Sequence, residues 1–296
     1  MSVPQRIAIT GASGLIGTAL VGHLKAEGHT VQRLVRRTPV GADEVQWDPQ
    51  TGFVDLEPLR GVDAIIHLAG VGVGDKRWSK KYKSEILNSR LLGTTAIAKA
   101  VAELKPQVFI SASAIGWYGE SGNRAVVESD RAGDDFLAAV CREWEAAADL
   151  AGDVRTVKIR TGLVLDPTGG ALGRMLPLFR LGLGGKLGNG KQWWSWITLH
   201  DQIRAIDFAL ENPISGPVNL TAPNPVTNQE FTAALARAMH RPALFPAPAI
   251  ALKIALGGFS SEILGSKRVI PHVLQEAGFT WDYPHISEAL TALIED

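Results

Sequence analysis

Three glycines near the N-terminus have the spacing that most directly indicates chemistry. Gly11, Gly14 and Gly17 lie between a strand-like run, Arg6 to Thr10, and a run of helical period. In such a turn the first glycine permits a tight bend, the second permits close approach to a pyrophosphate, and the third permits close helix packing. The helix N-terminus adds free N–H groups and the positive end of a dipole. We therefore predict a phosphate-binding turn rather than a turn of small residues without a ligand. Its residues are Gly11, Ser13, Gly14, Leu15, Ile16 and Gly17.

The end of the next strand-like run indicates which dinucleotide would bind. An NAD site has an acidic residue about 20 residues beyond the glycines, which accepts a hydrogen bond from the ribose 2′-hydroxyl. Here Val35 is followed instead by Arg36 and Arg37. Guanidinium groups bind a 2′-phosphate through bidentate, charge-assisted hydrogen bonds. The sequence therefore favours NADP(H) as the cofactor; the alternative for either arginine is a solvated strand end.

The elements that must position this turn alternate between strand length and helical period. Such alternation predicts βαβ units and hence an α/β fold of the Rossmann type, with a doubly wound parallel sheet. The predicted strands are Arg6 to Thr10, Thr30 to Val35, Asp63 to Leu68, Val108 to Ser111 and Val154 to Ile159. Long helices are predicted from Ser79 to Leu104 and from Asp134 to Leu150.

A change of texture after Asp166 predicts a second domain. The chain becomes dense in glycine there, and a capping box, Thr227 to Glu230, later begins a helix. A helical run from Asp201 to Leu210 and a strand-like run from Pro217 to Thr221 form one more αβ pair. We expect an NADP-binding Rossmann domain over residues 1–165, with residues 197–222 packing back on it. A smaller, α-rich substrate domain would span residues 166–296.

Composition limits the partners of the chain. Among 296 residues, 30 Lys and Arg balance 30 Asp and Glu, so any polyanion-binding surface must be local, and we expect no nucleic-acid partner. No apolar run reaches the roughly 20 residues of a membrane span, so we expect no membrane partner. The single cysteine, Cys141, cannot form an internal disulfide and fits the cytoplasm. Histidine spacing predicts no metal site, and a monomer and a homodimer remain open.

Further motifs give the chain a family resemblance. With the glycines, His67-Leu68-Ala69-Gly70 and Ser111-Ala112-Ser113 resemble the extended short-chain dehydrogenase/reductase superfamily. A narrower set looks like its atypical, NAD-dependent epimerase/dehydratase-like branch, usually labelled epimerase family proteins and in places cell-division inhibitors. The set comprises Arg77-Trp78, Ser89-Arg90, Gly182 to Gly185, Gln192 to Ile197 with Asp201, and the tail motifs Ser266 to Pro271 and Glu276 to Phe279.

The resemblance implies a Rossmann domain that holds NADP(H) and a smaller domain that closes over the substrate. By similarity, Val35 and Arg36 would flank the adenosine phosphate. Leu68, Ala69 and Gly70 would line the pyrophosphate and its ribose, and Glu85, Arg90 and Val164 would also touch the cofactor. Arg90 suits a second anion clamp and Glu85 a ribose-hydroxyl acceptor, the alternative being ordinary charges on a helix surface.

The chain departs from the superfamily at its usual catalytic pair, Tyr-x-x-x-Lys. The alignment of the helix by Glu143-Trp144-Glu145 puts Leu137 at the Tyr position and Cys141 at the Lys position. Leu has no proton to give, and a buried thiol is inert. Ser113 stands at the superfamily's hydrogen-bonding Ser, and Tyr118 could replace the missing acid if its loop folds inward. We take Ser113 and Tyr118 as the candidate catalytic residues, a structural aromatic being the alternative for Tyr118.

Two other groups carry weaker hypotheses. Trp193, Trp194 and Trp196 could form an apolar wall for a ring-shaped ligand or could pack between the domains. His200 and Asp201 resemble a general-base pair, but a helix start favours Asp201 as an N-cap.

Three functions follow, and whether the protein turns over remains open among them. The leading one is an NADP(H)-dependent oxidoreductase or isomerase-like protein that acts on an unknown small organic substrate. The alternatives are a nucleotide-sugar epimerase and a non-catalytic NADP(H) sensor that regulates a partner.

Overall fold

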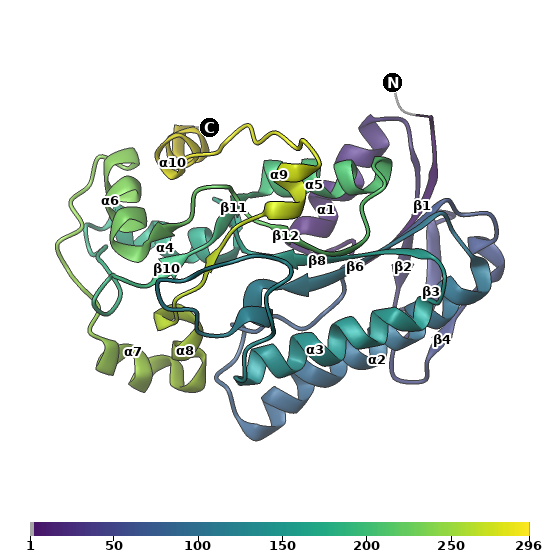
Figure 1. Cartoon of the computed structure of the whole chain (residues 1–296), viewed down its shortest axis with the longest axis horizontal. Helices are drawn as coiled ribbons and strands as arrows, with labels where there is room; N and C mark the ends of the chain where they lie inside the picture. Colours follow the sequence, from purple (N-terminus) through teal and green to yellow (C-terminus); the bar gives the residue numbers. More distant parts are fainter. Residues whose placement is uncertain (1–2, 296) are drawn as a thin grey trace.

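A mostly parallel sheet of eight strands forms the centre of the molecule (Figure 1). The structure, a computed structural model, describes residues 3–295. The strands lie in the order β12-β8-β6-β5-β1-β2-β3-β4, and the one antiparallel pair is β3 with β4. Their bounds are β1 (Arg6–Thr10), β2 (Thr30–Val35), β3 (Glu44–Asp48), β4 (Phe53–Val54), β5 (Ala64–His67), β6 (Val108–Ala114), β8 (Arg155–Thr161) and β12 (Gly216–Leu220).

Helices cover both faces of this sheet, which explains why its central strands are continuously apolar. Successive strand residues point to opposite faces. In β1, Ile7 and Ile9 pack with α1 (Leu15–Ala26) and α5 (Leu199–Glu211). Ala8, between them, packs on the other face with α2 (Lys80–Leu104) and α3 (Phe136–Ala148). The predicted fold class, a doubly wound Rossmann sheet, is confirmed.

The strand order reverses between β1 and β5. From β1 the chain proceeds to β2 and β3 on one side, whereas β5, β6, β8 and β12 extend the sheet on the other. Thr10 and His67, at the carboxyl ends of β1 and β5, are neighbours in register. Ligands of open α/β sheets bind in the crevice at such a reversal. The glycine-rich turn therefore opens onto the expected binding position.

The remaining elements build the C-terminal region and the loops that join it to the sheet. The short strands are β7 (Ala125–Val126), β9 (Leu163–Asp166), β10 (Trp193–Trp194), β11 (Trp196–Thr198), β13 (Val226–Thr227) and β14 (Arg268–Val269). The helices are α4 (Gly170–Arg180), α6 (Asn228–Ala238), α7 (Ala249–Leu256), α8 (Ser260–Leu264), α9 (His272–Glu276) and α10 (Ile286–Glu295). Single 3₁₀ turns are η1 (Glu57–Leu59), η2 (Ile115–Tyr118), η3 (Asp149–Ala151) and η4 (Gly257–Phe259). No helix within residues 3–295 is long and apolar enough to cross a membrane.

The C-terminal region has its own apolar core around Trp196, which is fully buried. Trp194 lies beside Phe231 of α6, with ring centroids 5.1 Å apart. These two tryptophans therefore pack within the C-terminal core, and not between the domains as the alternative prediction stated. The capping box is also confirmed: the Thr227 hydroxyl accepts the N–H of Glu230, and the Glu230 carboxylate accepts the N–H of Thr227.

The prediction for Asp201 is wrong. The N-cap of α5 is Thr198, whose hydroxyl accepts the N–H of Asp201 at 3.0 Å. The buried Asp201 carboxylate accepts the N–H groups of Asp282 and Tyr283, each at 3.0 Å. It therefore anchors the chain that leads into α10. Its neighbour His200 pairs with Asp282 at 2.6 Å and not with Asp201 as a general base would.

Gly17 is required for a reason other than helix–sheet packing. A Cβ at Gly17 would lie 2.1 Å from the carbonyl oxygen of Gly11, so the first turn of α1 closes directly on the glycine-rich turn. A Cβ at Gly22, five residues later in the same helix, would meet nothing within 4 Å.

We predict opposite effects of alanine at these two positions. Gly17→Ala should destabilise the protein by several kcal/mol, because the backbone of the turn must shift. Gly22→Ala should stabilise it by roughly 0.5–1 kcal/mol, because alanine restricts the unfolded chain and fits the helix. Urea unfolding of the two variants and the wild type measures both effects. Equal changes in the free energy of unfolding would contradict the close contact.

Candidate functional site

The glycine-rich turn lies directly against the end of the neighbouring strand β5. Gly11 has φ +70°, and a Cβ there would lie 2.9 Å from both the Ala69 nitrogen and the Leu68 carbonyl carbon. Only glycine fits that conformation at that separation. The turn and the Leu68–Gly70 segment therefore lie side by side at the strand-order reversal, where open α/β sheets have their binding crevice.

Helix α1 begins with free N–H groups pointing toward this crevice. Its N-cap is Gly14, which has no side chain to satisfy the first-turn donors. A Cβ at Gly14 would meet only the Gly11 oxygen, at 3.4 Å, so contacts within the protein do not require glycine at this position. A hollow of about 340 Å³ adjoins the turn, lined by Ser13, Gly14, Leu15, Thr18, Ala19, Thr168 and Leu199. Open space beside Gly14 and free donors fit the approach of a phosphate group.

Thr10 fixes the end of β1 to the end of β5. Its hydroxyl oxygen accepts the N–H groups of Leu68 at 3.2 Å and Ala69 at 3.3 Å, and shares a 2.7 Å hydrogen bond with His67 Nδ1. His67 is fully buried, and Trp47 meets its ring edge to face at 5.9 Å. Burial lowers the pKa of His67 to about 3, so the ring is neutral at physiological pH.

The two arginines after β2 have different surroundings. Arg37 donates to both carboxylate oxygens of Glu44, at 2.6 and 2.8 Å, and this pairing lowers the pKa of Glu44 to about 2. Arg36 is exposed and has no hydrogen bond or ion pair with any residue in the described range 3–295. Of the two, Arg36 is the one whose guanidinium is unengaged at the strand end.

Helix α2 brings Arg90 to the other side of the crevice. Arg90 Nη1 donates to the carbonyls of Val71 at 3.0 Å and Ile86 at 3.1 Å. A Cβ at Gly70 would lie 3.6 Å from the Arg90 Cζ, so the guanidinium lies against the Leu68–Gly70 edge. Its other neighbour is the Trp144 ring, at 4.8 Å. Burial lowers the pKa of this guanidinium, which an anion beside it would oppose.

Glu85 and Val164, two further residues of the predicted cofactor site, make fewer polar side-chain contacts. Glu85, one turn before Arg90 in α2, is partly exposed, and its carboxylate lies 3.5 Å from Lys76 Nζ. Val164 pairs with Ile197 between β9 and β11, where the C-terminal region begins. The cofactor roles of Val35, Arg36, Arg37, Glu85, Arg90 and Val164 stay predictions.

Leu137 and Cys141, which align with the superfamily's Tyr and Lys positions on α3, face the turn η2. A Cβ at Gly116, in η2, would lie 3.2 Å from the Leu137 Cβ and 3.6 Å from the Cys141 sulfur. Cys141 is buried, its Sγ lies 3.6 Å from the Ala114 carbonyl oxygen, and burial raises the pKa of the thiol to about 12. This thiol is neither a nucleophile nor a cation, as the sequence analysis predicted.

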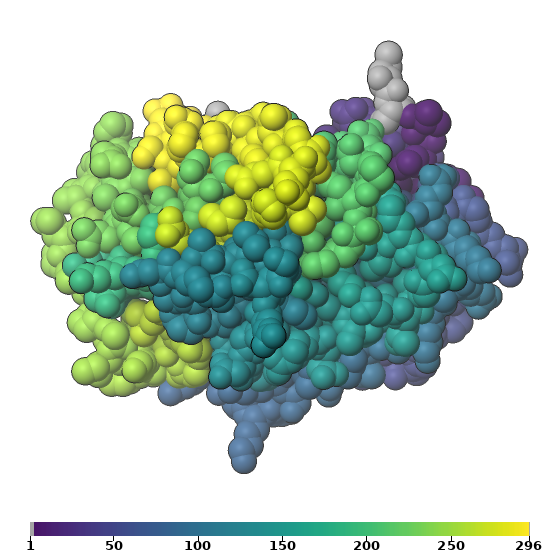
Figure 2. Space-filling model, viewed as in Figure 1, coloured from purple at the N-terminus to yellow at the C-terminus, as the bar shows by residue number. Residues whose placement is uncertain are grey.

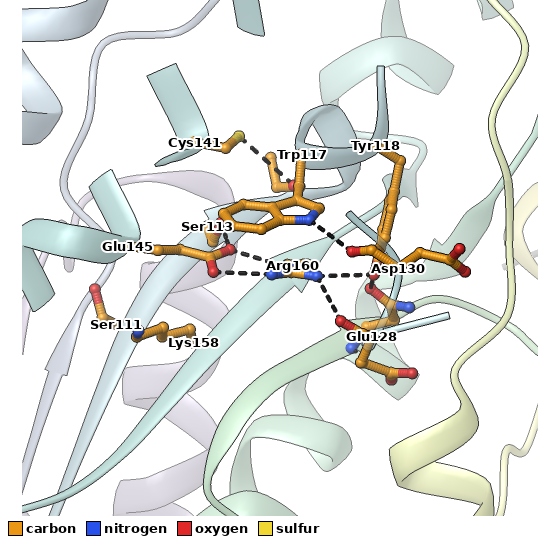
Figure 3. Close-up of polar contacts among 12 residues, drawn as sticks. Ser111, Ser113, Trp117, Tyr118, Glu128, Asp130, Cys141, Glu145, Lys158 and Arg160 are labelled. Atoms are coloured by element: carbon orange, nitrogen blue, oxygen red, sulfur yellow. Dashed lines mark hydrogen bonds and ion pairs between the residues drawn. The ribbon is translucent and has the colours of Figure 1, made fainter. Parts of the chain in front are cut away.

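A buried ionic network lies at the carboxyl ends of β6 and β8 (Figure 3). Arg160 of β8 donates through Nε and Nη2 to the two carboxylate oxygens of Glu145, at 2.8 and 2.9 Å. The Ser113 hydroxyl donates to the same carboxylate at 2.7 Å. The Arg160 guanidinium also lies 3.9 Å from the centre of the Trp117 ring. Ser113 is therefore tied to Glu145 rather than free to bind a substrate oxygen in this arrangement.

Tyr118 belongs to the same network. Its hydroxyl donates to Asn219 Oδ1 at 2.7 Å and accepts from Arg160 Nη1 at 3.1 Å. Burial raises the pKa of Tyr118 to about 12, although Arg160 opposes that rise. The hydroxyl therefore already donates one hydrogen bond and accepts another within the protein, which favours the structural alternative. The catalytic role of Tyr118 stays a prediction.

Asn219 carries the network into the C-terminal region. Its side-chain amide donates to the Ile270 carbonyl at 3.0 Å, and its backbone N–H donates to the Glu128 carboxylate, also at 3.0 Å. The sequence analysis missed Glu145, Arg160, Asn219 and Glu128. Arg160 offered one signal, since it directly follows the predicted strand Val154 to Ile159, and a charged side chain that is buried at a strand end needs a partner.

The sequence of this fold matches a known family. Residues 7–221 match the NAD dependent epimerase/dehydratase family. The chain belongs to this family. Residues 247–293 match DUF1731, a domain of unknown function, which confirms the characteristic tail.

Several related proteins match this chain over nearly its whole length. It is 46% identical to an epimerase family protein of Mycobacterium leprae, covering 96% of this chain and 94% of that protein. The crystal structure of human epimerase family protein SDR39U1 with NADPH is 34% identical, with TM-score 0.91, over 98% of this chain and 99% of that one. A nucleoside-diphosphate sugar epimerase from Corynebacterium glutamicum is 36% identical with TM-score 0.79, covering 99% of this chain and 58% of that one.

The buried His67 predicts a pH dependence of stability. In the unfolded chain His67 titrates near its ordinary pKa of about 6.5, whereas in the folded protein its pKa is about 3. As the pH falls between these values the unfolded state takes up a proton that the folded state does not. The free energy of unfolding should therefore fall by about 2 kcal/mol between pH 7 and pH 5.

Urea unfolding across this pH range tests the role of His67. His67→Gln should remove most of that slope, whereas a matched change at the exposed His240, His240→Gln, should leave it in place. If His67→Gln does not fold, imidazole NMR of the wild type decides, because His67 should stay neutral at pH 5. A protonated His67 at that pH would contradict the assignment.

Proposed function

We propose that this chain binds NADP(H) in the crevice at the reversal of its sheet and uses it in hydride transfer with a small organic substrate. The observation that carries the proposal is the glycine-rich turn, with free N–H groups on α1, at the carboxyl ends of β1 and β5. The relative crystallised with NADPH, at 34% identity over 98% of this chain, supports the choice of cofactor. The bound nicotinamide would supply or accept the hydride.

The residues of the crevice divide the binding between them. The turn from Gly11 to Gly17 would hold the pyrophosphate through backbone N–H groups and the dipole of α1. Arg36 would bind the 2′-phosphate, since Arg37 is paired with Glu44. Arg90, against Gly70, would add a second cation on the far side of the crevice. Together these contacts favour the phosphorylated dinucleotide over NAD(H).

A second candidate is a protein that binds NADP(H) without turnover. Leu137 and Cys141 occupy the positions of the acid–base pair, and the Tyr118 hydroxyl is held by Asn219 and Arg160. These observations favour a sensor. The lack of a Tyr and a Lys at these two positions also argues against a nucleotide-sugar epimerase, because oxidising a sugar carbon requires a base for its hydroxyl proton. One relative at 36% identity is nevertheless named as such an epimerase.

Thermal unfolding with NADPH, NADP⁺, NADH and NAD⁺ tests the cofactor proposal. A ligand of the native state raises the unfolding midpoint. We expect NADPH and NADP⁺ to raise it more than NADH and NAD⁺ at equal concentration. The absence of any shift would refute cofactor binding.

Titration of the Arg36→Gln variant tests the phosphate contact. Loss of a charge-assisted hydrogen bond should weaken NADPH binding by roughly 10- to 100-fold and leave NADH binding nearly unchanged. The matched control is Arg60→Gln. Arg60 is an exposed arginine that pairs with Glu57, and it precedes the amino end of β5, whereas Arg36 follows the carboxyl end of β2. Equal losses for both nucleotides would contradict the role of Arg36.

Oxidation of NADPH in the presence of pooled metabolites distinguishes an enzyme from a sensor. Protein-dependent loss of absorbance that Arg36→Gln reduces would support turnover. Stabilisation by NADPH without any such oxidation would favour the sensor.

A further inference from the structure

Seven large apolar side chains of the C-terminal region are 51–73% exposed. They come from the end of α4, the turn after it, the segment 242–247 and the outer side of α7. We call this set the apolar ridge. Its members are Leu178, Leu181, Leu183, Leu244, Phe245, Ile250 and Ile254. Single exposed apolar residues are ordinary, but a group of this size on one region marks an interaction surface.

The backbone beneath the ridge is fixed. The Phe245 N–H donates to the Gly184 carbonyl at 3.2 Å, and the Ala247 N–H donates to the Lys186 carbonyl at 2.9 Å. A Cβ at Gly185 would lie 2.1 Å from the Phe245 oxygen, so glycine is needed for this close approach. The Gly182–Gly185 motif, to which the cofactor crevice gives no role, therefore holds the segment that presents Leu244 and Phe245.

Helix α7 continues the ridge. Ile250 and Ile254 are one helical turn apart and so lie on the same side, with the exposed Lys253 beside them. Leu252 and Leu256 are only partly buried, and no residue of α7 is fully buried. The helices α4, α6 and α7 lie at one end of the molecule, and β1 to β4 lie at the other (Figures 1 and 2).

Two segments of this region differ in charge from the whole chain. Residues 167–200 and 231–261 contain no Asp or Glu and seven Lys and Arg, although the whole chain is neutral. The cations nearest to ridge residues in sequence are Arg180, Lys186, Arg241 and Lys253. Of the seven cations, Arg174 is paired with Asp75 at 3.1 Å, whereas these four have no ion pair within residues 3–295. Exposed apolar side chains beside unpaired cations match a surface that is apolar below and anionic above.

We propose that the apolar ridge docks on an anionic lipid surface, as a peripheral contact and without a membrane-spanning helix. Leu, Ile and Phe side chains would enter the headgroup and acyl boundary while the neighbouring Arg and Lys bind lipid phosphates. A symmetric dimer through this face is disfavoured, because the same cations would meet across the two-fold axis. The proposal gives α7, which lies within the domain of unknown function, a role independent of cofactor binding.

Vesicle co-sedimentation of the full chain tests the proposal. The probes are vesicles of phosphatidylcholine alone and of phosphatidylcholine mixed with phosphatidylglycerol. We expect sedimentation with the anionic vesicles at low salt, at least several-fold less with the neutral vesicles, and a decrease as salt rises. Equal binding to both vesicles, or binding to neither, would overturn the proposal.

Two double variants separate the apolar and charged contributions. Ile250→Ser with Ile254→Ser, and Arg180→Glu with Lys253→Glu, should each reduce anionic binding at least several-fold. The matched control combines Val40→Ser and Lys99→Glu, which are exposed on the Rossmann domain, and should bind as the wild type does. Retained binding in both ridge variants would refute the ridge.

Two further readouts keep the outcomes distinct. Stabilisation by NADPH should be the same in the ridge variants and the wild type, so a loss of vesicle binding with that response intact reports on the ridge alone. Light scattering measures the oligomeric state in the same samples. A dimer that the isoleucine variant converts to a monomer would overturn the lipid proposal in favour of a second copy of the chain.

Discussion

The close contact between the ends of β1 and β5 is the constraint on which the cofactor crevice depends. At Gly11 there is no room for a Cβ against Leu68 and Ala69, and the Thr10 hydroxyl accepts the N–H groups of those two residues. Because the two strand ends are fixed to each other, the first turn of α1 is held above the point where the sheet reverses. The donors of α1, Arg36 after β2 and Arg90 beside Gly70 then lie around this strand-order reversal, where open α/β sheets bind their ligands.

The network around Arg160 shows what this chain contains beneath the position of the usual acid–base pair. A buried guanidinium is costly unless its donors are satisfied, and here Glu145, Tyr118 and the Glu128 carbonyl accept from it. Satisfaction of Arg160 engages the hydroxyls of Ser113 and Tyr118, which are the groups a reductase would use. The network holds these two hydroxyls in hydrogen bonds and connects β6 and β8 with the C-terminal region, and this arrangement is the physical argument for the proposed sensor.

Local patterns explain which parts were predictable from sequence. Arg6–Thr10 and Thr30–Val35 match the predicted strands because apolar runs and glycines define them without tertiary information. β3 was missed: Glu44 to Asp48 is short, and its partners lie in other strands. That omission mattered for the site, since Glu44 on β3 engages Arg37 and so distinguishes it from Arg36. The Arg160 network was beyond reach, because its members are far apart in sequence and meet only in the folded chain.

The net charge of zero is a sum over the whole chain, in which the acidic and basic residues are unevenly distributed. The acids of this chain lie outside residues 167–200 and 231–261, and backbone hydrogen bonds at Gly184 and Lys186 bring these two acid-free segments together. A zero net charge therefore does not exclude a local excess of cations within the screening distance of about 8 Å at physiological salt. The argument from composition against polyanionic partners consequently applies less to these two segments than to the rest of the chain. In that region the same cations adjoin side chains that water solvates poorly, and this combination, rather than charge alone, favours a lipid surface over a soluble polyanion.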